Sequence, residues 1–262
     1  MKEVLTSILT TFAISSCLEE ISKQDEPEQN QDDTASIYAS IDTQSISRID
    51  YSGFTLWMDC SKKAAFKFEY TIANLVGNAS ATYNNSLDTS YVDCQQTSSS
   101  DYQASSGINY DAAQLVPAKH MDDDTSIIQD TYYMTNILPQ IQDMHRGAWQ
   151  ETEDIAECYG KDSTVEIYGG VLWEITHIDE SFKLSHGIDT PSHFWKMLVY
   201  NDTVLAWIIP NTQDANSLAL DRYVTQTSTL LDILEQINVD IDYNYISTLE
   251  ESNTWSDIYP CN

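Results

Sequence analysis

Two short segments carry the side chains best suited to chemistry: YDAAQLVPAKHM at residues 110–121 and YYMTNILPQIQDMHRGAWQETE at residues 132–153. The first is framed like a catalytic loop, but an alanine pair and Gln114 follow its acid, and an amide has no useful basicity near neutral pH. In the second segment, the imidazole of His145 suits Zn²⁺, Ni²⁺ or Cu²⁺ better than Mg²⁺. His145 and Glu153, which is eight residues further along a predicted helix, together predict a weak transition-metal site. The alternative is that His145 is an exposed histidine at a site that binds no metal.

The order and spacing of these motifs resemble the DNA/RNA non-specific endonuclease family, the secreted sugar-non-specific nucleases with a ββα-metal active site. The family signature Asp-Arg-Gly-His reads DAAQ at residues 111–114. The later family motifs match TNILPQ at residues 135–140, HRGAW at residues 145–149 and then Glu153. The resemblance extends from about Gly53 to about Ile237, and it includes the later strands GGVLW, TPSHFWKMLVY and LAWIIPN.

The resemblance implies a mechanism in which one Mg²⁺, held by a single Asn and several waters, binds the scissile phosphate. A histidine then takes the proton of the attacking water, and arginines neutralise the charge that builds on phosphorus. This sequence departs at those positions. Gln114 replaces the general base, Ala112 replaces an arginine, Ala113 replaces the glycine of the turn, His145 replaces the metal-binding Asn, and Thr71 stands where the family often carries another arginine.

The remaining family positions are retained. Asp111 and Glu153 are implied catalytic residues, Glu153 also being a candidate metal ligand beside His145. The resemblance implies nucleic-acid-binding roles for Asn136, Gln140 and Arg146.

Three functional hypotheses follow. The leading one is an exported protein of nuclease fold whose catalysis is lost or severely weakened. Loss of proton transfer typically costs ~10²–10⁴ in rate, and loss of a preorganised charge contact costs roughly 10²–10³, although such penalties do not simply add. The second hypothesis is a working endonuclease with an altered metal site around His145 and Glu153. The third is a cell-surface binding module that reuses the fold as a scaffold.

The charge balance argues against a broad nucleic-acid-binding surface. Forty-one acids against 12 Lys and Arg give a formal net charge of −29. This charge repels phosphate backbones and anionic lipid unless salt or divalent cations screen it. DNA or RNA, the partner that the family resemblance implies, is therefore expected to bind weakly. The same composition is typical of adaptation to a salty medium.

The N-terminal sequence predicts export. Residues 1–17 carry one Lys, an apolar stretch and then Ser-Ser-Cys, which is too short to span a bilayer as a mature helix. The segment resembles a bacterial lipoprotein signal in which Cys17 is lipidated and anchors the chain to a membrane. An ordinary cleaved signal and a buried amphipathic helix remain the alternatives. The expected location is extracellular, periplasmic or lipid-anchored at the cell envelope.

The cysteines are consistent with export. Apart from Cys17, an even number remains in an oxidising compartment, without CxxC pairs or zinc spacing. We predict the disulfides Cys60–Cys94 and Cys158–Cys261, because Cys60 ends a strand, Cys94 lies in a loop that must return to the sheet, and Cys261 can fix the tail to the central helix. Four cysteines allow three pairings.

Hydrophobic patterning predicts one α+β domain over residues 49–262, with a central antiparallel sheet flanked by helices and a ββα-metal-type site. It follows an acidic, flexible linker at residues 18–48. A long surface excursion is expected at residues 77–107. Strands are expected at 53–60, 64–72, 131–140, 164–173, 194–200 and 203–210, and helices at 147–159 and 220–237. His120 is expected to be structural, and the acidic run at residues 122–124 a solvated helix start.

Overall fold

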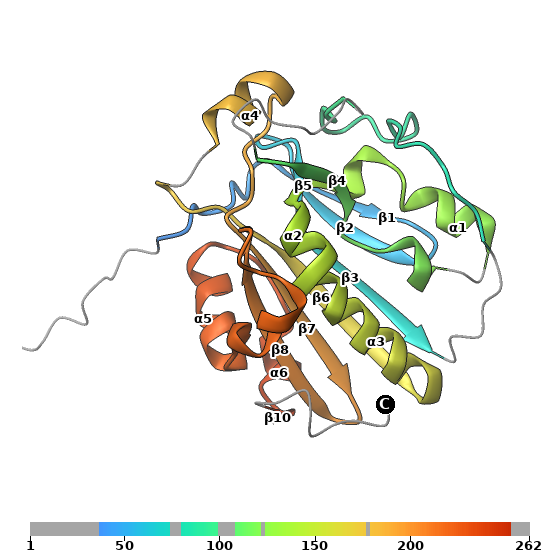
Figure 1. Ribbon diagram of the computed structural model, residues 1–262, viewed down its shortest axis with the longest axis vertical. Helices are drawn as coiled ribbons and strands as arrows, with labels where there is room; N and C mark the ends of the chain where they lie inside the picture. The colour runs from blue at the N-terminus through green and yellow to red at the C-terminus, as the bar shows by residue number, and fades with distance from the viewer. Residues whose placement is uncertain (1–36, 74–79, 99–107, 122–123, 177–178, 253–262) are drawn as a thin grey trace, which may run out of the picture. The chain divides into compact units, whose positions relative to one another are not determined.

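A twisted sheet forms the centre of the fold in the computed structural model, which describes residues 37–73, 80–98, 108–121, 124–176 and 179–252 (Figure 1). Within these residues the sheet has eight strands, ordered β1-β2-β3-β6-β7-β8-β10 with β9 beside β8. All neighbouring strands are antiparallel except β8 and β10. The strands are β1 (Ile46–Asp50), β2 (Phe54–Asp59), β3 (Ala64–Ala73), β6 (Thr164–Leu172), β7 (His193–Tyr200), β8 (Thr203–Pro210), β9 (Val224–Thr225) and β10 (Glu250–Glu251).

Helices cover the sheet, and a separate two-stranded ribbon carries the first candidate motif. Helix α3 packs against β3, β6 and β7, whereas α5 packs against β8 (Figure 1). No helix among the described residues is long and apolar enough to cross a membrane. The helices are α1 (Thr125–Asp130), α2 (Gln142–Met144), α3 (Gln150–Asp162), α4 (Glu180–His186), α5 (Thr227–Gln236) and α6 (Tyr243–Ile246). Short 3-10 helices span Ala118–His120, Met134–Asn136 and Ser217–Tyr223, and the segment His145–Trp149 between α2 and α3 is kinked at Gly147, whose backbone is not helical. The predicted α+β fold, with a central antiparallel sheet flanked by helices, is confirmed.

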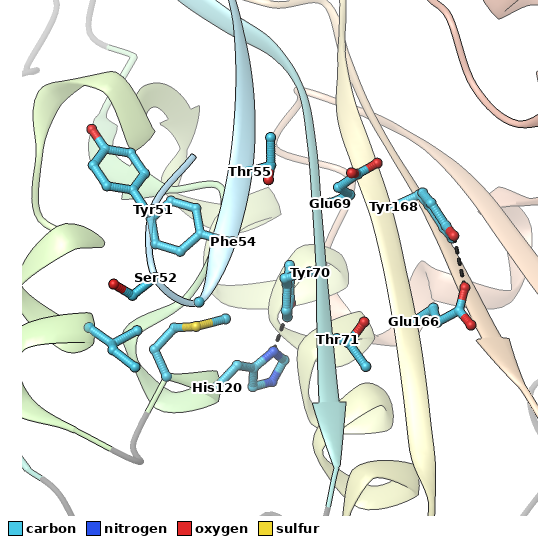
Figure 2. Close-up of a pocket in the computed structure, with 13 residues that line it drawn as sticks. Tyr51, Ser52, Phe54, Thr55, Glu69, Tyr70, Thr71, His120, Glu166 and Tyr168 are labelled. Atoms are coloured by element: carbon cyan, nitrogen blue, oxygen red, sulfur yellow. Dashed lines mark hydrogen bonds between the residues drawn. The ribbon is translucent and has the colours of Figure 1, made fainter. Parts of the chain in front are cut away.

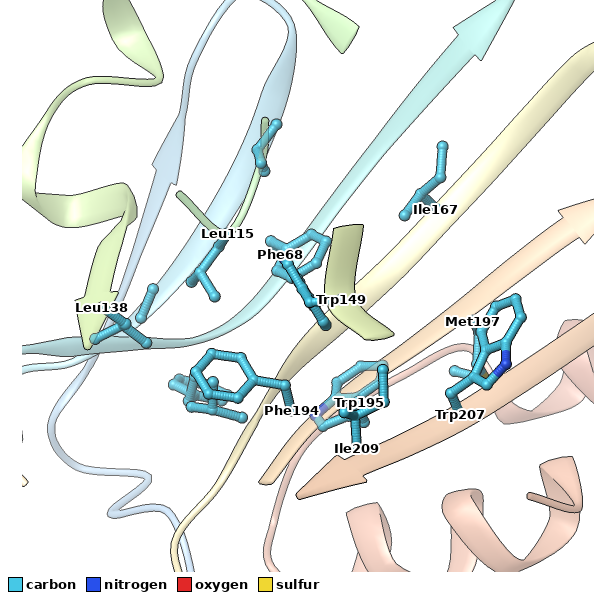
Figure 3. Packing of buried hydrophobic residues seen from close by; sticks show 14 of the residues in the cluster. Phe68, Leu115, Leu138, Trp149, Ile167, Phe194, Trp195, Met197, Trp207 and Ile209 are labelled. Carbon is cyan, nitrogen blue, oxygen red and sulfur yellow. The ribbon is translucent and has the colours of Figure 1, made fainter. Parts of the chain in front are cut away.

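The core between α3 and the sheet is built from large aromatic side chains (Figure 3). Trp149, fully buried just before α3, meets Phe68 of β3 and Phe194 of β7 edge-on, with ring centroids 6.3 and 5.4 Å apart. Phe68 lies directly over Gly169 of β6, where an added Cβ would come within 2.1 Å of the ring. The glycine therefore allows the close contact between the ring and the sheet that seats α3.

The domain begins earlier than the sequence predicted. Of the predicted linker at residues 18–48, the part beyond residue 36 is folded: Ile41 is buried and its amide donates to the carbonyl of Ile237, and β1 pairs with β2. The folded domain therefore includes the described residues from Ile37 onward. The prediction failed here because Ile41 and the β1 residues are isolated apolar positions in a polar stretch. Residues 1–36, including Cys17, lie outside the described residues.

The helix predicted at residues 220–237 is also wrong in its first half. A 3-10 helix ends at Tyr223, the two-residue strand β9 pairs with β8, and only Thr227–Gln236 is α-helical. Leu220, Leu230 and Leu234 are buried as the apolar periodicity predicted. The interruption arises because pairing with β8 satisfies backbone groups that a continuous helix would have satisfied internally.

The excursion after β3 is fixed against the domain. The predicted Cys60–Cys94 disulfide is confirmed. Asp88 is buried and accepts hydrogen bonds from the hydroxyls of Tyr51 and Ser90, at 2.9 and 2.6 Å. The disulfide and the hydrogen bonds of Asp88 thus fix the described part of the excursion to the rest of the domain. Cys158 is disulfide-bonded as well, but Cys261 lies outside the described residues, so its pairing with Cys158 stays a prediction.

Candidate active site

The residues expected in a catalytic loop form a strand instead. β4 (Tyr110–Gln114) pairs antiparallel with β5 (Ile137–Ile141), placing Asp111 opposite Gln140 and Gln114 opposite Ile137. Pro139 lies in this two-stranded ribbon, where a missing backbone N–H is tolerated because neither strand is central to a larger sheet. The two motifs recognised in the sequence are therefore brought together as adjacent strands.

The side-chain amide of Gln114 is fully used in local structure. Its Nε2 donates to the carbonyl oxygen of Thr131 at 3.1 Å and to Thr131 Oγ1 at 2.9 Å. Its Oε1 accepts from the backbone N–H of Ala118 at 3.0 Å, at the start of the 3-10 helix. Gln114 thus joins β4 to the two segments that follow it, and it offers no basic atom to a reactant.

Asp111 lies at the centre of a second network. Its carboxylate accepts hydrogen bonds from Arg146 Nε and Nη2, both at 2.8 Å, and from Gln142 Nε2 at 3.0 Å. One carboxylate oxygen also lies 2.7 Å from His145 Nδ1. Burial acts to raise the pKa of Asp111, but the hydrogen bonds from Arg146 and His145 outweigh it and lower the pKa. Arg146, a predicted nucleic-acid-binding residue, is therefore engaged in a bidentate ion pair, although its side chain is 62% exposed.

Glu153 is buried in the first turns of α3 among positive groups. Lys119 Nζ lies 3.6 Å from its carboxylate and also pairs with Asp154. Lys196 from β7 is fully buried, donates to Thr152 Oγ1 at 2.8 Å and lies 3.6 Å over the ring of Trp149. Burial raises the pKa of Glu153 and lowers that of Lys196 to about 7. The positive charge of Lys196 acts against the rise in the pKa of Glu153, and the charge of Glu153 acts against the fall in the pKa of Lys196.

A cavity of about 240 Å³ joins these parts. It is lined by Asn85, Ala112, Ala113, Gln114, Pro117, Tyr132, His145 and Glu153. The structure therefore gathers the substituted general-base, arginine and metal-ligand positions with the retained glutamate at one place. The cavity is small, and its β4 wall consists of two methyl groups and an amide already hydrogen-bonded elsewhere.

Sequence reasoning missed Asn85. It reaches the cavity because the excursion pairs with the segment before β5: Ser86 N donates to Tyr132 O at 3.1 Å, and Met134 N donates to Ser86 O at 2.8 Å. The surrounding sequence is uniformly rich in Ser, Asn and Thr. No signal in that composition distinguishes Asn85 from its polar neighbours.

Asn136 and Gln140, the predicted nucleic-acid-binding residues on β5 and just before it, bond to nearby backbone in the structure. Both side chains are fully buried. Asn136 bridges segments, its Oδ1 accepting from Val116 N at 3.0 Å and its Nδ2 donating to the carbonyls of Val116 and Thr131, both at 2.9 Å. Gln140 Nε2 reaches the carbonyl of Gln114 at 3.5 Å. These amides hold the ribbon in place, and a nucleic-acid-binding role for them stays a prediction.

His120 has the structural role predicted for it. Its Nδ1 lies 2.8 Å from the hydroxyl of Tyr70, and its Nε2 lies 3.1 Å from the carbonyl oxygen of Glu153 (Figure 2). Burial, with the positive charges of Lys196 and Lys119, lowers its pKa to about 3. His120 is therefore a neutral link between β3 and α3 and not a substitute base.

Two further sequence predictions can be placed. Asp124 caps α1, its Oδ1 accepting from Ser126 N at 2.7 Å, which fits the predicted solvated helix start, while residues 122–123 lie outside the described residues. Thr71 lines a different and larger cavity, so it does not line the cavity beside Gln114 and Glu153.

The donor set does not fit the Mg²⁺ site that the resemblance implies. Mg²⁺ prefers oxygen ligands in octahedral geometry, whereas His145 presents an imidazole where a carbonyl oxygen is expected. Among the described residues, no group of three or more His, Cys, Asp and Glu is placed to hold a metal ion. The side chains that could supply ligands at the cavity are His145, Glu153 and the amide of Asn85.

Comparison with known proteins agrees with this architecture. The family model described as DNA/RNA non-specific endonuclease matches residues 33–250. The fold is similar to a solved chain in a crystal structure of the EndoG/EndoGI complex, which concerns the mechanism of EndoG inhibition. The TM-score is 0.57 at 16% sequence identity, covering 79% of this chain and 90% of that chain. No curated protein matches. Because the family match spans most of the sequence and the site motifs occupy one cavity, this chain belongs to the DNA/RNA non-specific endonuclease family.

Proposed function

We propose that this protein keeps the nuclease fold but has lost phosphodiester hydrolysis, or retains only a severely weakened form of it. The observation that carries the proposal is the hydrogen bonding of the Gln114 side chain. At the general-base position stands an amide whose oxygen and nitrogen are both bound to backbone and hydroxyl groups. No proton can be accepted there near neutral pH, and rotation toward a reactant would break three hydrogen bonds at a cost of about 0.5–1.5 kcal/mol each.

The surroundings of Gln114 do not compensate for the missing base. The described residues that line the cavity include no Arg or Lys to stabilise charge on phosphorus, and Lys119, beside the lining Glu153, pairs with Glu153 and Asp154. Arg146, which could approach from the rim, is committed to Asp111. Preorganised charge of this kind is usually the largest contribution to such catalysis, so its absence supports the proposal independently of the base.

Nucleic acid is the ligand class that family membership suggests, and we propose that binding is weak. The net charge of −29 opposes the approach of a polyanion. We also propose that the protein is exported and anchored through a lipidated Cys17, on the basis of the apolar N-terminal segment and the Ser-Ser-Cys that ends it. In this setting the fold would act at the cell envelope as a binding scaffold or a remnant enzyme.

A plasmid-nicking assay in Mg²⁺ tests the loss of activity. We expect purified native protein to leave supercoiled plasmid uncut under conditions where an active family nuclease converts it fully. Fluorescence anisotropy with labelled single-stranded DNA and RNA separates two versions of the proposal. Affinity that falls as salt rises indicates a remnant enzyme that still binds its substrate, whereas no affinity indicates a scaffold for another ligand.

A second candidate function is an endonuclease with an altered metal site, favoured by one observation. His145, Glu153 and Asn85 line the same small cavity and supply nitrogen and oxygen donors. Imidazole with carboxylate suits Zn²⁺ or Ni²⁺, and these metals also activate bound water. Lys119, 3.6 Å from Glu153, opposes this function because its charge competes with a cation.

Calorimetry decides whether this metal site exists. We expect Mg²⁺ binding to be undetectable, and any Zn²⁺ or Ni²⁺ binding to disappear in His145→Ala, because the imidazole is the strongest donor in the cavity. The control is His186→Ala, which removes a histidine on α4, far from the motifs in sequence. Equal transition-metal binding by native protein and His145→Ala would remove His145 from the site.

A further inference from the structure

The imidazole of His145 is oriented by a carboxylate that is itself fixed. His145 Nδ1 lies 2.7 Å from Oδ2 of Asp111. Arg146 donates to both oxygens of that carboxylate at 2.8 Å, and Gln142 donates to Oδ1 at 3.0 Å. A carboxylate that accepts from these donors has no proton to give, so the contact with His145 places the proton on Nδ1. The neutral imidazole then carries its lone pair on Nε2.

The Nε2 side of this ring belongs to the cavity. His145 lines the cavity of about 240 Å³ together with Gln114 and Glu153, whereas Asp111 is not among the described residues that line it. Because Nδ1 is turned toward Asp111, the other side of the ring is the part that meets the cavity. The side chain of His145 is 33% exposed and that of Asp111 is 16% exposed, so a ligand reaches the imidazole more readily than the carboxylate.

His145 does not replace Gln114 as a base for hydrolysis. It stands at the metal-ligand position, and hydrolysis needs a base that takes a proton from a water molecule held beside the phosphate. RNA needs no such water, because each ribose carries a 2′-hydroxyl next to its own phosphate. A nucleophile within the substrate removes the entropic cost of positioning a separate one. A base that reaches the 2′-hydroxyl therefore suffices for RNA and not for DNA.

Arg146 places a cation beside the imidazole. Its Nε lies 2.8 Å from Oδ2 of Asp111, the oxygen that His145 also contacts, so the guanidinium and the imidazole lie next to each other. The ion pair with Asp111 uses Nε and Nη2 and leaves Nη1 outside it. The side chain is exposed, and a guanidinium suits the oxygens of a phosphate. Because Asp111 neutralises much of this charge, we expect weak phosphate binding and a slow reaction.

We propose that this protein cleaves RNA by transesterification without a metal ion, with His145 as the general base and Asp111 as the residue that positions it. The 2′-hydroxyl proton passes to His145 Nε2 while O2′ bonds to phosphorus. The bond from phosphorus to O5′ breaks, and solvent water protonates the leaving oxygen. His145 returns its proton to the hydroxide that remains. The products are a 2′,3′-cyclic phosphate and a 5′-hydroxyl end.

This reaction goes beyond the proposed loss of hydrolysis and is tested separately from it. A labelled DNA oligonucleotide that contains a single ribonucleotide is incubated with native protein in excess EDTA, with enough salt to screen the net charge. The same oligonucleotide made entirely of DNA is the matched substrate. We expect one cut, directly after the ribonucleotide, with a 2′,3′-cyclic phosphate end identified by mass spectrometry. The all-DNA oligonucleotide should stay intact.

Three variants separate the roles of the two residues. His145→Ala should lower the rate at least roughly 10²-fold, the smallest effect typical of losing a general base, and added imidazole should restore part of it. Asp111→Asn should lower the rate at least roughly tenfold, because an amide does not fix the imidazole tautomer, and imidazole should not restore it. The control His186→Ala removes a histidine on α4 and should leave the rate unchanged.

Four results would overturn the proposal. The first is native protein that leaves the ribonucleotide substrate uncut in EDTA. The second is an equal rate in native protein and in His145→Ala purified identically, which would assign the cut to a contaminating ribonuclease. Product ends that carry a 5′-phosphate would show hydrolysis instead, and cutting of the all-DNA oligonucleotide in EDTA would show that no 2′-hydroxyl is needed. Circular dichroism of each variant confirms that a lost rate does not arise from unfolding.

Discussion

Combined replacement of Ala112→Arg, Ala113→Gly, Gln114→His and His145→Asn should produce a protein that nicks supercoiled plasmid in Mg²⁺. All four positions belong to the ribbon and the turn before α3, and each lines the same cavity with Glu153. The changes restore a base, a cation, a flexible turn and an oxygen ligand together. We expect nicking at least roughly 10²-fold above that of the native protein, the smallest gain that restoring one such group typically gives.

Single repairs should fail. Gln114→His alone supplies a base without a metal site and removes the three hydrogen bonds that join β4 to Thr131 and Ala118. His145→Asn alone supplies a metal ligand without a base. Because the groups act as a unit, their effects are strongly non-additive. Adding Glu153→Ala to the combined variant is the control and should abolish its activity. A folded combined variant that stays inactive would show that the backbone of the site has drifted.

The second large effect concerns acid stability. Folded protein should lose on the order of 3 kcal/mol between pH 6.5 and pH 4 through His120 alone. Its pKa falls from 6.5 to about 3 on folding, chiefly through burial. Between these values the unfolded chain binds a proton that the folded protein does not, so stability rises with pH across this window and is lost as pH falls. Well above pH 6.5 His120 is neutral in both the folded and the unfolded chain, so it causes no loss of stability there.

Urea denaturation at a series of pH values measures this effect, with His120→Gln as the matched variant. The glutamine can still bond to Tyr70 and to the carbonyl of Glu153, but it does not titrate. The difference in unfolding free energy between native protein and variant should therefore shift in favour of the variant as pH falls from 6.5 to 4. Parallel pH profiles for the two proteins would show that His120 does not bind its proton with a lowered pKa.

The sequence predicted those parts of the fold whose signals are local. The hairpin of β2 and β3, the later strands and α3 follow from apolar periodicity, and the Cys60–Cys94 bond follows from the position of each cysteine beside the sheet. Family motifs placed Gln114, His145 and Glu153 in one site, and the structure brings them to one cavity.

Other features depend on contacts between distant segments and escaped prediction. Asn85 enters the site only because the excursion forms backbone hydrogen bonds with Tyr132 and Met134. Asn136 and Gln140 are polar residues in a polar motif, and only the folded structure shows that Asn136 bonds to the backbone of Val116 and Gln140 to that of Gln114. The strand character of residues 110–114 likewise requires its partner, because two alanines give no alternation of apolar and polar side chains.

One measurement tests the central claim most directly: the rate at which native protein nicks supercoiled plasmid in Mg²⁺, Mn²⁺, Zn²⁺ and Ni²⁺, each with and without a chelator. Glu153→Ala, purified identically, controls for a contaminating nuclease. If the protein has lost its general base and its charge stabilisation of phosphorus, as we propose, native protein should leave the plasmid uncut in every metal. Chelator-sensitive nicking by native protein that disappears in Glu153→Ala would contradict the loss of catalysis and establish a working enzyme with an altered metal site.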